Sequence, residues 1–106
     1  MTDIVTTFAA LGDPVRFAIA ERLLKNGPQS AGALQDLANI SPPAFSRHLK
    51  VLRKAGVISQ TKDKQRRIYA IQPQAVQQIT RWSQTHAAFW EPSLDRLAHA
   101  LDERSP

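Results

Sequence analysis

The sequence predicts a mostly α-helical fold that carries one β-hairpin. Apolar residues recur at helical spacing in four segments before residue 56, follow a strand pattern between residues 57 and 71, and return to helical spacing after residue 73. A chain of 106 residues is long enough for one packed core and short for two. We therefore expect a single domain over residues 1–106.

Two helices are expected before residue 27. The first follows a cap at Thr2 or Asp3 and ends at Gly12. Asp13 caps the second, a proline suits its first position, and an Asn-Gly-Pro break ends it at Asn26. The apolar faces expected of these helices are Val5, Phe8 and Leu11 in the first, and Phe17, Ala20, Leu23 and Leu24 in the second.

Two more helices, joined by a tight turn, are expected next. Ser30 is suited to cap a short third helix that reaches Asn39. A turn over residues 39–41 leads at once into a fourth helix, which Ser41 caps and Gly56 ends. The inward side chains expected of the third helix are Leu34, Leu37 and Ala38.

A β-hairpin and a C-terminal helical region complete the prediction. Residues 57–61 and 67–71 are rich in β-branched or aromatic side chains, and a polar, charged link over residues 62–66 separates them. Pro73 opens the helical region, and Pro92 is expected to kink or divide it within a residue or two of Glu91. The last three residues, 104–106, have the character of a loose tail.

Basic residues are concentrated in one part of the chain. The net charge is +5, but residues 41–67 alone carry eight of the fourteen Lys and Arg residues and one of the nine acidic residues. The rest of the chain is therefore slightly acidic. Charge alone would fit nucleic acid or an anionic membrane, but local basicity of this kind is typical of a nucleic-acid-binding surface.

The fourth helix is predicted to have an apolar and a basic side. Phe45, Leu49 and Leu52 share the side that holds it to the domain. The other side has small residues near its start and cations farther along, so it can enter a DNA major groove, with free N–H groups at its N-terminus binding a phosphate. A solvated surface helix carries such charges too. The expected DNA contacts are Ser41, Pro43, Ser46, Arg47, His48, Lys50 and Lys54, of which Ser46 and Arg47 reach base edges while His48, Lys50 and Lys54 touch phosphates.

The hairpin favours the same interpretation, because its tip is crowded with cations and has no apolar group to bury. A hairpin lying beside DNA explains this pattern, and the alternative is a solubilising edge hairpin defended by lysines. We expect the ring of Tyr69 to pack in the core and its hydroxyl to be free to meet a phosphate. The remaining expected contacts are Lys62, Lys64, Arg66 and Arg67.

Several classes of protein are excluded or disfavoured. The chain has no cysteine, so disulfides, thiolate metal sites and thiol redox sensing are excluded. No run of 18 apolar residues and no secretory leader are visible, so we expect a cytoplasmic protein without a membrane span. Neither a glycine-rich phosphate loop nor a recognisable catalytic constellation supports an enzyme.

Two segments resemble the ArsR family of bacterial winged helix-turn-helix repressors. They are FAALGDPVR at residues 8–16 and ISPPAFSRHLKVLRKAGVI at residues 40–58. The most specific part is SRHL at residues 46–49, followed by Leu52 and an Ala-Gly pair, and the DPVR sequence at residues 13–16 adds independent support. The resemblance covers nearly the whole chain.

The resemblance implies a homodimeric repressor that binds double-stranded DNA. The fourth helix would lie in the major groove, the hairpin would form a wing along the flanking backbone or minor groove, and the first and last helices would form the dimer. The family's wing usually turns at a glycine, whereas here Asp63-Lys64 or Lys64-Gln65 must serve. Asp tolerates left-handed geometry, so the turn type stays open. The expected interface residues are Ile4, Val5, Phe8, Ile79, Trp82, Phe89, Trp90, Leu94 and Leu97.

No metal or cofactor is expected, and the effector is unknown. Many relatives sense metals, and the C-terminal region has residues of types that bind zinc, namely His86, Asp95, His99, Asp102 and Glu103. Their spacing departs from the family's pattern, which has Asp where this chain has Gln84. The aromatic stripe near the C-terminus resembles a branch of the family without a known ligand site, and it favours a protein interface. Two alternatives stay open: a zinc-responsive repressor, and a winged-helix module whose basic surface meets an acidic protein instead of DNA.

Overall fold

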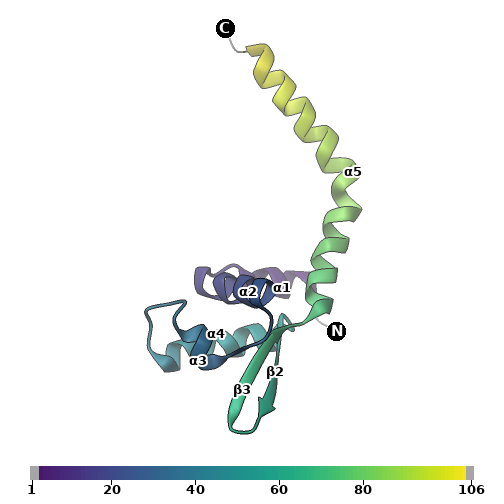
Figure 1. Ribbon diagram of the computed structural model, residues 1–106. Coiled ribbons are helices and arrows are strands. Elements are labelled where there is room, and N and C mark those ends of the chain that lie inside the picture. The colour runs from purple at the N-terminus through teal and green to yellow at the C-terminus, as the bar shows by residue number, and fades with distance from the viewer. Residues whose placement is uncertain (1–2, 105–106) are drawn as a thin grey trace. The chain divides into compact units, whose positions relative to one another are not determined.

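The computed structural model describes residues 3–104 and confirms the mostly helical fold with a hairpin (Figure 1). It divides into two units, Met1–Val76 and Gln77–Pro106. The last residues of the expected tail, 105 and 106, lie outside the described residues. The elements are α1 (Ile4–Leu11), α2 (Pro14–Asn26), β1 (Gln29–Ser30), α3 (Ala31–Gln35), α4 (Pro42–Lys54), β2 (Ile58–Asp63), β3 (Arg66–Ile71) and α5 (Pro73–Arg104).

The expected caps of the first two helices are present. Asp3 precedes α1, and its Oδ1 accepts a hydrogen bond from the backbone N–H of Thr6 at 2.8 Å. Asp13 precedes α2, and its Oδ2 accepts from the N–H groups of Val15 at 2.9 Å and Arg16 at 3.1 Å. These bonds satisfy N–H groups that have no partner within the helix.

The buried face of α2 differs from the expected one. Ile19, Ala20 and Leu23 are buried, whereas Phe17 and Leu24 are 50% and 56% exposed. The buried face follows the helical repeat that begins at Arg16 and continues through Ile19, Ala20 and Leu23. The prediction failed for Phe17 and Leu24 because it started the apolar repeat at the first aromatic residue.

The hairpin is confirmed, with longer strands and a shorter turn than expected. Strands β2 and β3 pair antiparallel from Ile58 opposite Ile71 to Asp63 opposite Arg66, so Lys64 and Gln65 form a two-residue turn. Lys64 has φ of 59°, in the left-handed region, and among the described non-glycine residues it is the one with positive φ. A positive φ at the first turn position alone is the pattern of a type II′ turn. Lys64, and not Asp63, therefore takes the strained geometry.

A short third strand and a shorter third helix are the remaining differences in the first unit. Gln29 and Ser30 form β1, which pairs with β3 opposite Tyr69 and Ile68, so the sheet order is β1-β3-β2. Helix α3 ends at Gln35 instead of Asn39. The side-chain Nε2 of Gln35 donates to the carbonyl of Ile40 at 3.2 Å, which closes the turn that leads into α4.

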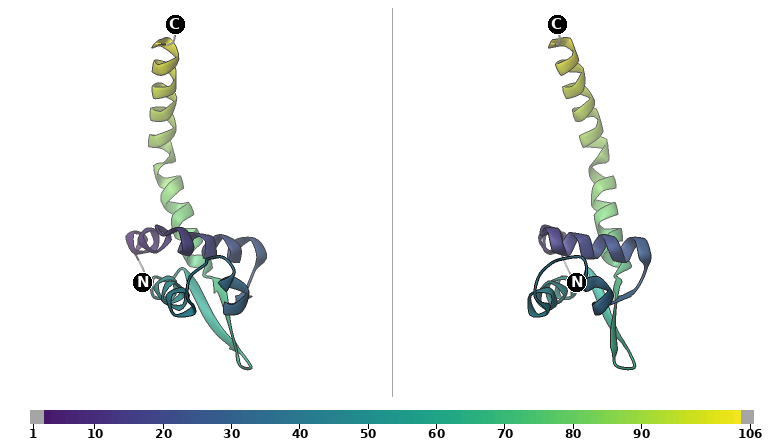
Figure 2. Two further views of the ribbon diagram at one scale, coloured as in Figure 1. Left: turned by 90° about the vertical axis from the view of Figure 1, so that its left-hand side faces the viewer. Right: turned by 60° about the vertical axis from the view of Figure 1, so that its left-hand side comes forward.

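The core of the first unit lies between the helices and the sheet. Its largest fully buried side chains are Phe45 of α4, Ile19 of α2, Leu34 of α3, Leu52 of α4, Ile58 of β2 and Thr7 of α1. Residues from four helices and two strands thus contribute to a single apolar cluster, since Tyr69 of β3 also belongs to it. In all three views of Figures 1 and 2, the tip of the β2–β3 hairpin extends away from helices α1 to α4.

Helix α5 runs from Pro73 to Arg104 and contains Pro92, so of the two expected outcomes, a kink or a division near Glu91, the division does not occur. Figures 1 and 2 show it as one curved ribbon. Pro92 has no N–H to donate to the turn before it. On the next residue, the hydroxyl of Ser93 donates to the carbonyl of Phe89 at 2.9 Å and adds a contact in the affected turn. None of the helices between residues 3 and 104 has the length and apolarity needed to cross a membrane.

Candidate nucleic-acid interface

Helix α4 has the two sides that the sequence predicts. Phe45, Leu49 and Leu52 are buried at 1%, 3% and 0% exposure. We call the opposite side the outer face of α4. Its members, all exposed, are Pro43, Ser46, Arg47, Lys50 and Lys54.

The N-terminus of α4 differs from the expected phosphate-binding site. Pro42 and Pro43 occupy the first two helical positions and have no N–H group. The N–H of Ala44 is taken by Oγ of the cap residue Ser41 at 3.3 Å. Contrary to the expectation, the first three helical positions therefore offer no free N–H group to a phosphate. Ser41 is exposed, but it serves as the cap.

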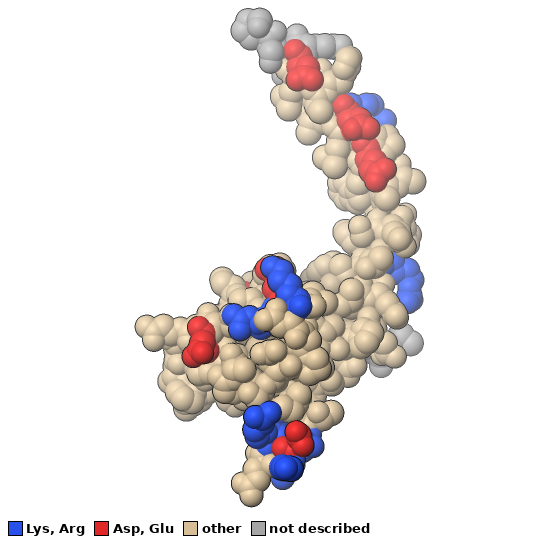
Figure 3. Space-filling view, viewed as in Figure 1, with Lys and Arg blue, Asp and Glu red and all other residues tan. Residues whose placement is uncertain are grey.

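The register of the hairpin divides its cations between two faces. Residues directly opposite each other on an antiparallel pair point to the same side of the sheet. Lys62 opposes Arg67, two positions along from the Gln60–Tyr69 pair, so these four share one face. Arg66 opposes Asp63 on the other face. Figure 3 shows Lys and Arg side chains gathered at the end of the hairpin, and Lys62, Lys64, Arg66 and Arg67 are all exposed.

A hollow of about 320 Å³ joins α4 to the hairpin. Arg47 and Lys50 of the outer face and Arg67 of β3 line it together, so the structure brings some predicted contacts of α4 and of the hairpin to one place. Four of the predicted Lys and Arg contacts do not line it, namely Lys54, Lys62, Lys64 and Arg66. Tyr69 also lines it and is 5% exposed, within the core cluster as expected for its ring. The full lining is Pro43, Ser46, Arg47, Leu49, Lys50, Arg53, Arg67 and Tyr69.

Arg53 is a member of this site that the sequence analysis did not include. It lines the hollow, and its Nη1 donates to the side-chain oxygen Oε1 of Gln60 on β2. A signal for it was present, because Arg53 follows Ser46 by seven positions and Lys50 by three, which is the repeat of one helical face.

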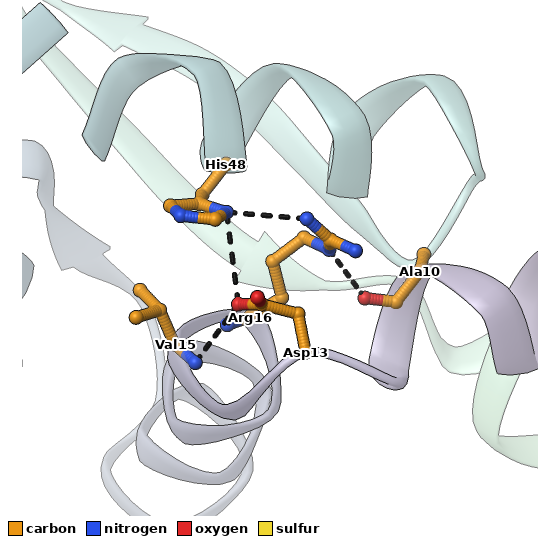
Figure 4. A network of polar contacts seen from close by, with 5 residues as sticks. All are labelled: Ala10, Asp13, Val15, Arg16 and His48. Atoms are coloured by element: carbon orange, nitrogen blue, oxygen red, sulfur yellow. Dashed lines mark hydrogen bonds and ion pairs between the residues drawn. The ribbon is translucent and has the colours of Figure 1, made fainter. Parts of the chain in front are cut away.

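His48 lies at a junction between α4 and the corner that joins α1 to α2 (Figure 4). Its Nδ1 is 3.2 Å from Nη1 of Arg16 and 3.7 Å from Oδ2 of Asp13. Arg16 also donates from Nε to the carbonyl of Ala10 at 2.7 Å, at the end of α1. We call Asp13, Arg16 and His48 the corner network. A phosphate contact by His48 stays a prediction, and Nδ1 already faces α2.

The electrostatics of the corner network favour an ionised Asp13. The hydrogen bond from the backbone N–H of Arg16 lowers the pKa of the Asp13 carboxyl below its ordinary value. Burial opposes this change, and the nearby charges of His48 and Arg16 lower the pKa further. The carboxylate therefore has two roles, as the cap of α2 and as a partner of His48 on α4.

Apolar side chains predicted at a subunit interface are largely exposed in this single chain. On α1, Val5 and Phe8 are 72% and 41% exposed, and Ile4 is intermediate. On α5, Ile79 is intermediate, and exposure is 42% for Trp82, 64% for Phe89, 49% for Trp90, 59% for Leu94 and 57% for Leu97.

The residues of metal-binding type on α5 are not gathered into a site. Over the described residues, no three His, Asp or Glu side chains come together in a metal-binding group. Nδ1 of His86 is 2.8 Å from the carbonyl of Trp82 one turn before it. The side chain of Glu103 lies outside the described residues.

Comparison with known proteins identifies a matching family model and several similar transcriptional regulators. A model described as a helix-turn-helix domain matches residues 11–61. The transcriptional repressor SdpR of Bacillus subtilis (strain 168) is 37% identical over 75 residues, covering 71% of this chain and 82% of that protein. The HTH-type transcriptional regulator Rv2034 of Mycobacterium tuberculosis (strain ATCC 25618 / H37Rv) is 34% identical over 93 residues, covering 88% and 83%.

A solved structure shows the same architecture. The crystal structure of the ArsR family transcriptional regulator RHA00566 aligns with a TM-score of 0.74 and 27% identity, and it covers 86% of this chain and 97% of that one. The chain belongs to the ArsR family of winged helix-turn-helix proteins, which are DNA-binding transcriptional regulators and not enzymes.

Proposed function

We propose that this regulator is a homodimeric repressor that acts in the cytoplasm and binds an imperfect palindrome in double-stranded DNA. The whole chain serves as one domain for DNA binding and dimerisation. Repression is proposed because the relative SdpR is named a transcriptional repressor. The observation that carries the DNA-binding surface is the shared hollow, because it places cations of α4 and of the hairpin on one side of the first unit.

The contacts divide into base reading and backbone positioning. Ser46 and Arg47 are exposed on the outer face of α4, where Arg47 can bond two acceptors of one guanine. The other cations bind phosphates, which fixes the register without reading sequence. We propose as positioning residues Ser41, Pro43, His48, Lys50, Lys54, Lys62, Lys64, Arg66, Arg67 and the hydroxyl of Tyr69.

Dimerisation is supported by the exposed apolar side chains on α1 and α5. Monomeric proteins rarely leave large apolar side chains such as those of α5 together in water, and a second copy of the chain is a partner that always has the matching residues. A symmetric dimer would place its recognition helices in successive major grooves, about 34 Å apart. The proposed interface is Ile4, Val5, Phe8, Ile79, Trp82, Phe89, Trp90, Leu94 and Leu97.

A gel-shift titration on DNA from the chain's own promoter region tests the function. We expect a retained complex with that duplex and weaker binding to an unrelated duplex of equal length. If the dimer neutralises about six to ten phosphates, the affinity should fall by about three to five powers of ten between 50 and 200 mM salt. No retained complex at micromolar protein and low salt would contradict the proposal and favour a module that binds an acidic protein.

Two further measurements separate the remaining alternatives. Light scattering across a concentration series should give the mass of a dimer, and a monomer at all concentrations would contradict the dimer. Adding zinc or a chelator should leave the DNA affinity unchanged. A several-fold shift in affinity would instead identify a zinc-responsive repressor.

A further inference from the structure

The hollow between α4 and the hairpin carries positive charge without acidic compensation. Arg47, Lys50, Arg53 and Arg67 line it, and its lining includes no Asp or Glu. Among the ion pairs of the described part of the chain, none involves these four residues. Next to the hollow, Lys62 stands directly opposite Arg67, and like charges in that position destabilise a sheet. An uncompensated group of this kind favours the binding of an anion.

Arg53 is fixed in place at the hollow by a neutral partner. Its Nη1 donates to Oε1 of Gln60, which lies opposite Tyr69 in the ladder between β2 and β3. An amide oxygen can hold a guanidinium without cancelling its charge, whereas a carboxylate would neutralise it. The bond engages one of the five N–H donors of the guanidinium. Arg53 is therefore oriented in advance while its charge stays available to a ligand.

The size and walls of the hollow suit a phosphate group. Its volume of about 320 Å³ has room for a phosphate with a few waters. Leu49 and Tyr69, which are 3% and 5% exposed, supply apolar wall atoms that lower the local dielectric and strengthen the attraction of cations for an anion. The prolines at the first two positions of α4 supply no N–H groups and the N–H of Ala44 is bonded to Ser41, so the side chains of the hollow are its main donors.

We propose that the hollow is a binding site for one phosphate group, which we call the oxyanion seat. Arg53 is the cation that the fold orients in advance to bind this group. The inference rests on the proposed function, since the phosphate that fills the seat belongs to the DNA backbone beside each recognition helix. A free oxyanion such as pyrophosphate shares this chemistry and competes for the same seat. Arg53 thus contributes to affinity without reading sequence, and Gln60 is the positioning residue that orients it while leaving its charge uncompensated.

The first test replaces Arg53 by Gln, with Arg22→Gln on α2 as the matched control for loss of one positive charge. We expect Arg53→Gln to weaken binding to the operator and to unrelated duplexes by the same factor, on the order of fivefold to tenfold. The slope of log affinity against log salt should fall by about one per subunit. Affinities and slopes equal to those of Arg22→Gln would overturn the proposal.

The second test uses Gln60→Glu, which keeps the contact with Arg53 but places a carboxylate beside it. The folded state gains an ion pair, so the melting temperature should hold or rise while the DNA affinity falls by a similar factor. The exposed Gln74→Glu at the start of α5 makes the same chemical change away from the hollow and should bind DNA as the wild type does. Full affinity in Gln60→Glu would overturn the role of Gln60 and Arg53. Because its melting temperature should not fall, a loss of DNA binding in Gln60→Glu cannot be attributed to unfolding.

The third test measures the binding of pyrophosphate to the protein without DNA. NMR chemical shifts of the Arg53 Nε–H and nearby amides are followed during the titration, and sodium chloride at matched ionic strength is the control. Saturable shifts that are absent in Arg53→Gln would support the seat and place the free anion in it. Uniform shifts like those caused by chloride would overturn the claim that a free oxyanion competes. Absence of any complex between the wild type and DNA would instead overturn the proposed function. Equal DNA affinities of the wild type and Arg53→Gln would overturn only the oxyanion seat.

Discussion

Nδ1 of His48 lies 3.2 Å from Nη1 of Arg16, and this contact joins α4 to the corner between α1 and α2. The same guanidinium donates from Nε to the carbonyl of Ala10 at 2.7 Å. One side chain of α2 therefore holds both the end of α1 and the middle of α4. The DPVR and SRHL sequences, which carried the family resemblance, meet at this point.

We predict that Arg16 and His48 are energetically coupled. In a double-mutant cycle of Arg16→Met and His48→Ala, the coupling in the free energy of unfolding should be about 0.5–1.5 kcal/mol, the worth of a partly exposed hydrogen bond. Urea unfolding of the four proteins measures it. The control cycle pairs Arg16→Met with Lys54→Ala, an exposed position on the same helix, and should show a coupling near zero. Equal couplings in the two cycles would contradict the role of the corner network.

The lowered pKa of Asp13 predicts an acid-sensitive fold. Its carboxyl has a pKa below the ordinary value of 3.8 in the folded state, chiefly because the N–H of Arg16 donates to it. The stabilisation is therefore complete above the unfolded value and is lost as pH falls through the lower, folded one. We expect the urea midpoint of the wild type to drop as the pH is lowered from about 4, the region of the unfolded value, through the lower pKa of the folded state. Asp13→Asn should have a lower urea midpoint than the wild type at neutral pH, and its midpoint should fall less as the pH is lowered. In the control Asp36→Asn, the urea midpoint should fall as much as in the wild type.

The elements of the fold could be predicted because their signals are local. Asp-Pro at the start of α2, Ser-Pro at the start of α4 and the change to a strand pattern after Gly56 each specify an element within a few residues. Strand β1 could not be predicted in this way, because two residues carry no periodicity and their pairing with β3 depends on tertiary contact. The exposure of Phe17 could not be predicted either, because tertiary contacts with the rest of the core decide which of two possible faces of α2 is buried.

The candidate site could be predicted in composition but not in geometry. The cations of α4 and of the hairpin are visible as a cluster in the sequence, but the hollow that joins them requires the sheet register. Arg53 needed the bond to Gln60 to stand out from other surface arginines. The prolines at positions 42 and 43 did give a signal that was overlooked, since neither residue has an N–H to offer a phosphate.

The hairpin turn predicts a stabilising substitution. Lys64 has φ of 59°, a conformation that costs a side chain about 1 kcal/mol or more and costs glycine nothing. Lys64→Gly should therefore raise the free energy of unfolding by up to about 1 kcal/mol, after the added freedom of the unfolded chain is subtracted. It should also weaken DNA binding, because a cation is lost. Gln65→Gly, at the turn position whose φ is not positive, should destabilise the protein; equal effects at both positions would contradict the assigned turn.

The register of the hairpin predicts that its arginines contribute unequally to DNA binding. Arg67 shares a face with Tyr69 and lines the hollow, whereas Arg66 pairs with Asp63 on the other face. Arg67→Ala should weaken specific and non-specific duplexes alike by about 1 kcal/mol or more, and Arg66→Ala should have a smaller effect. Arg47→Ala should instead reduce the preference for the operator, by about 1–3 kcal/mol. Fluorescence anisotropy with operator and scrambled duplexes separates the two kinds of loss.

The exposed stripe on α5 predicts how the dimer can be broken. Leu97 is 57% exposed in the single chain, and burying it at an interface would contribute about 1.5–3 kcal/mol per copy. A charge at this position must remain in water, so Leu97→Glu should raise the dissociation constant of the dimer at least about a hundredfold, since two copies are lost together. Ala88→Glu introduces the same charge on the opposite side of α5 and should leave the dimer intact. Sedimentation measures the dissociation constant of both variants.

The same substitution should change how the protein binds DNA. Each Leu97→Glu monomer binds one half-site alone, so its DNA affinity should be weak and should not depend on the spacing between half-sites. Gel shifts on operators with altered spacers measure this. A Leu97→Glu protein that remains dimeric at micromolar concentration would place the interface elsewhere.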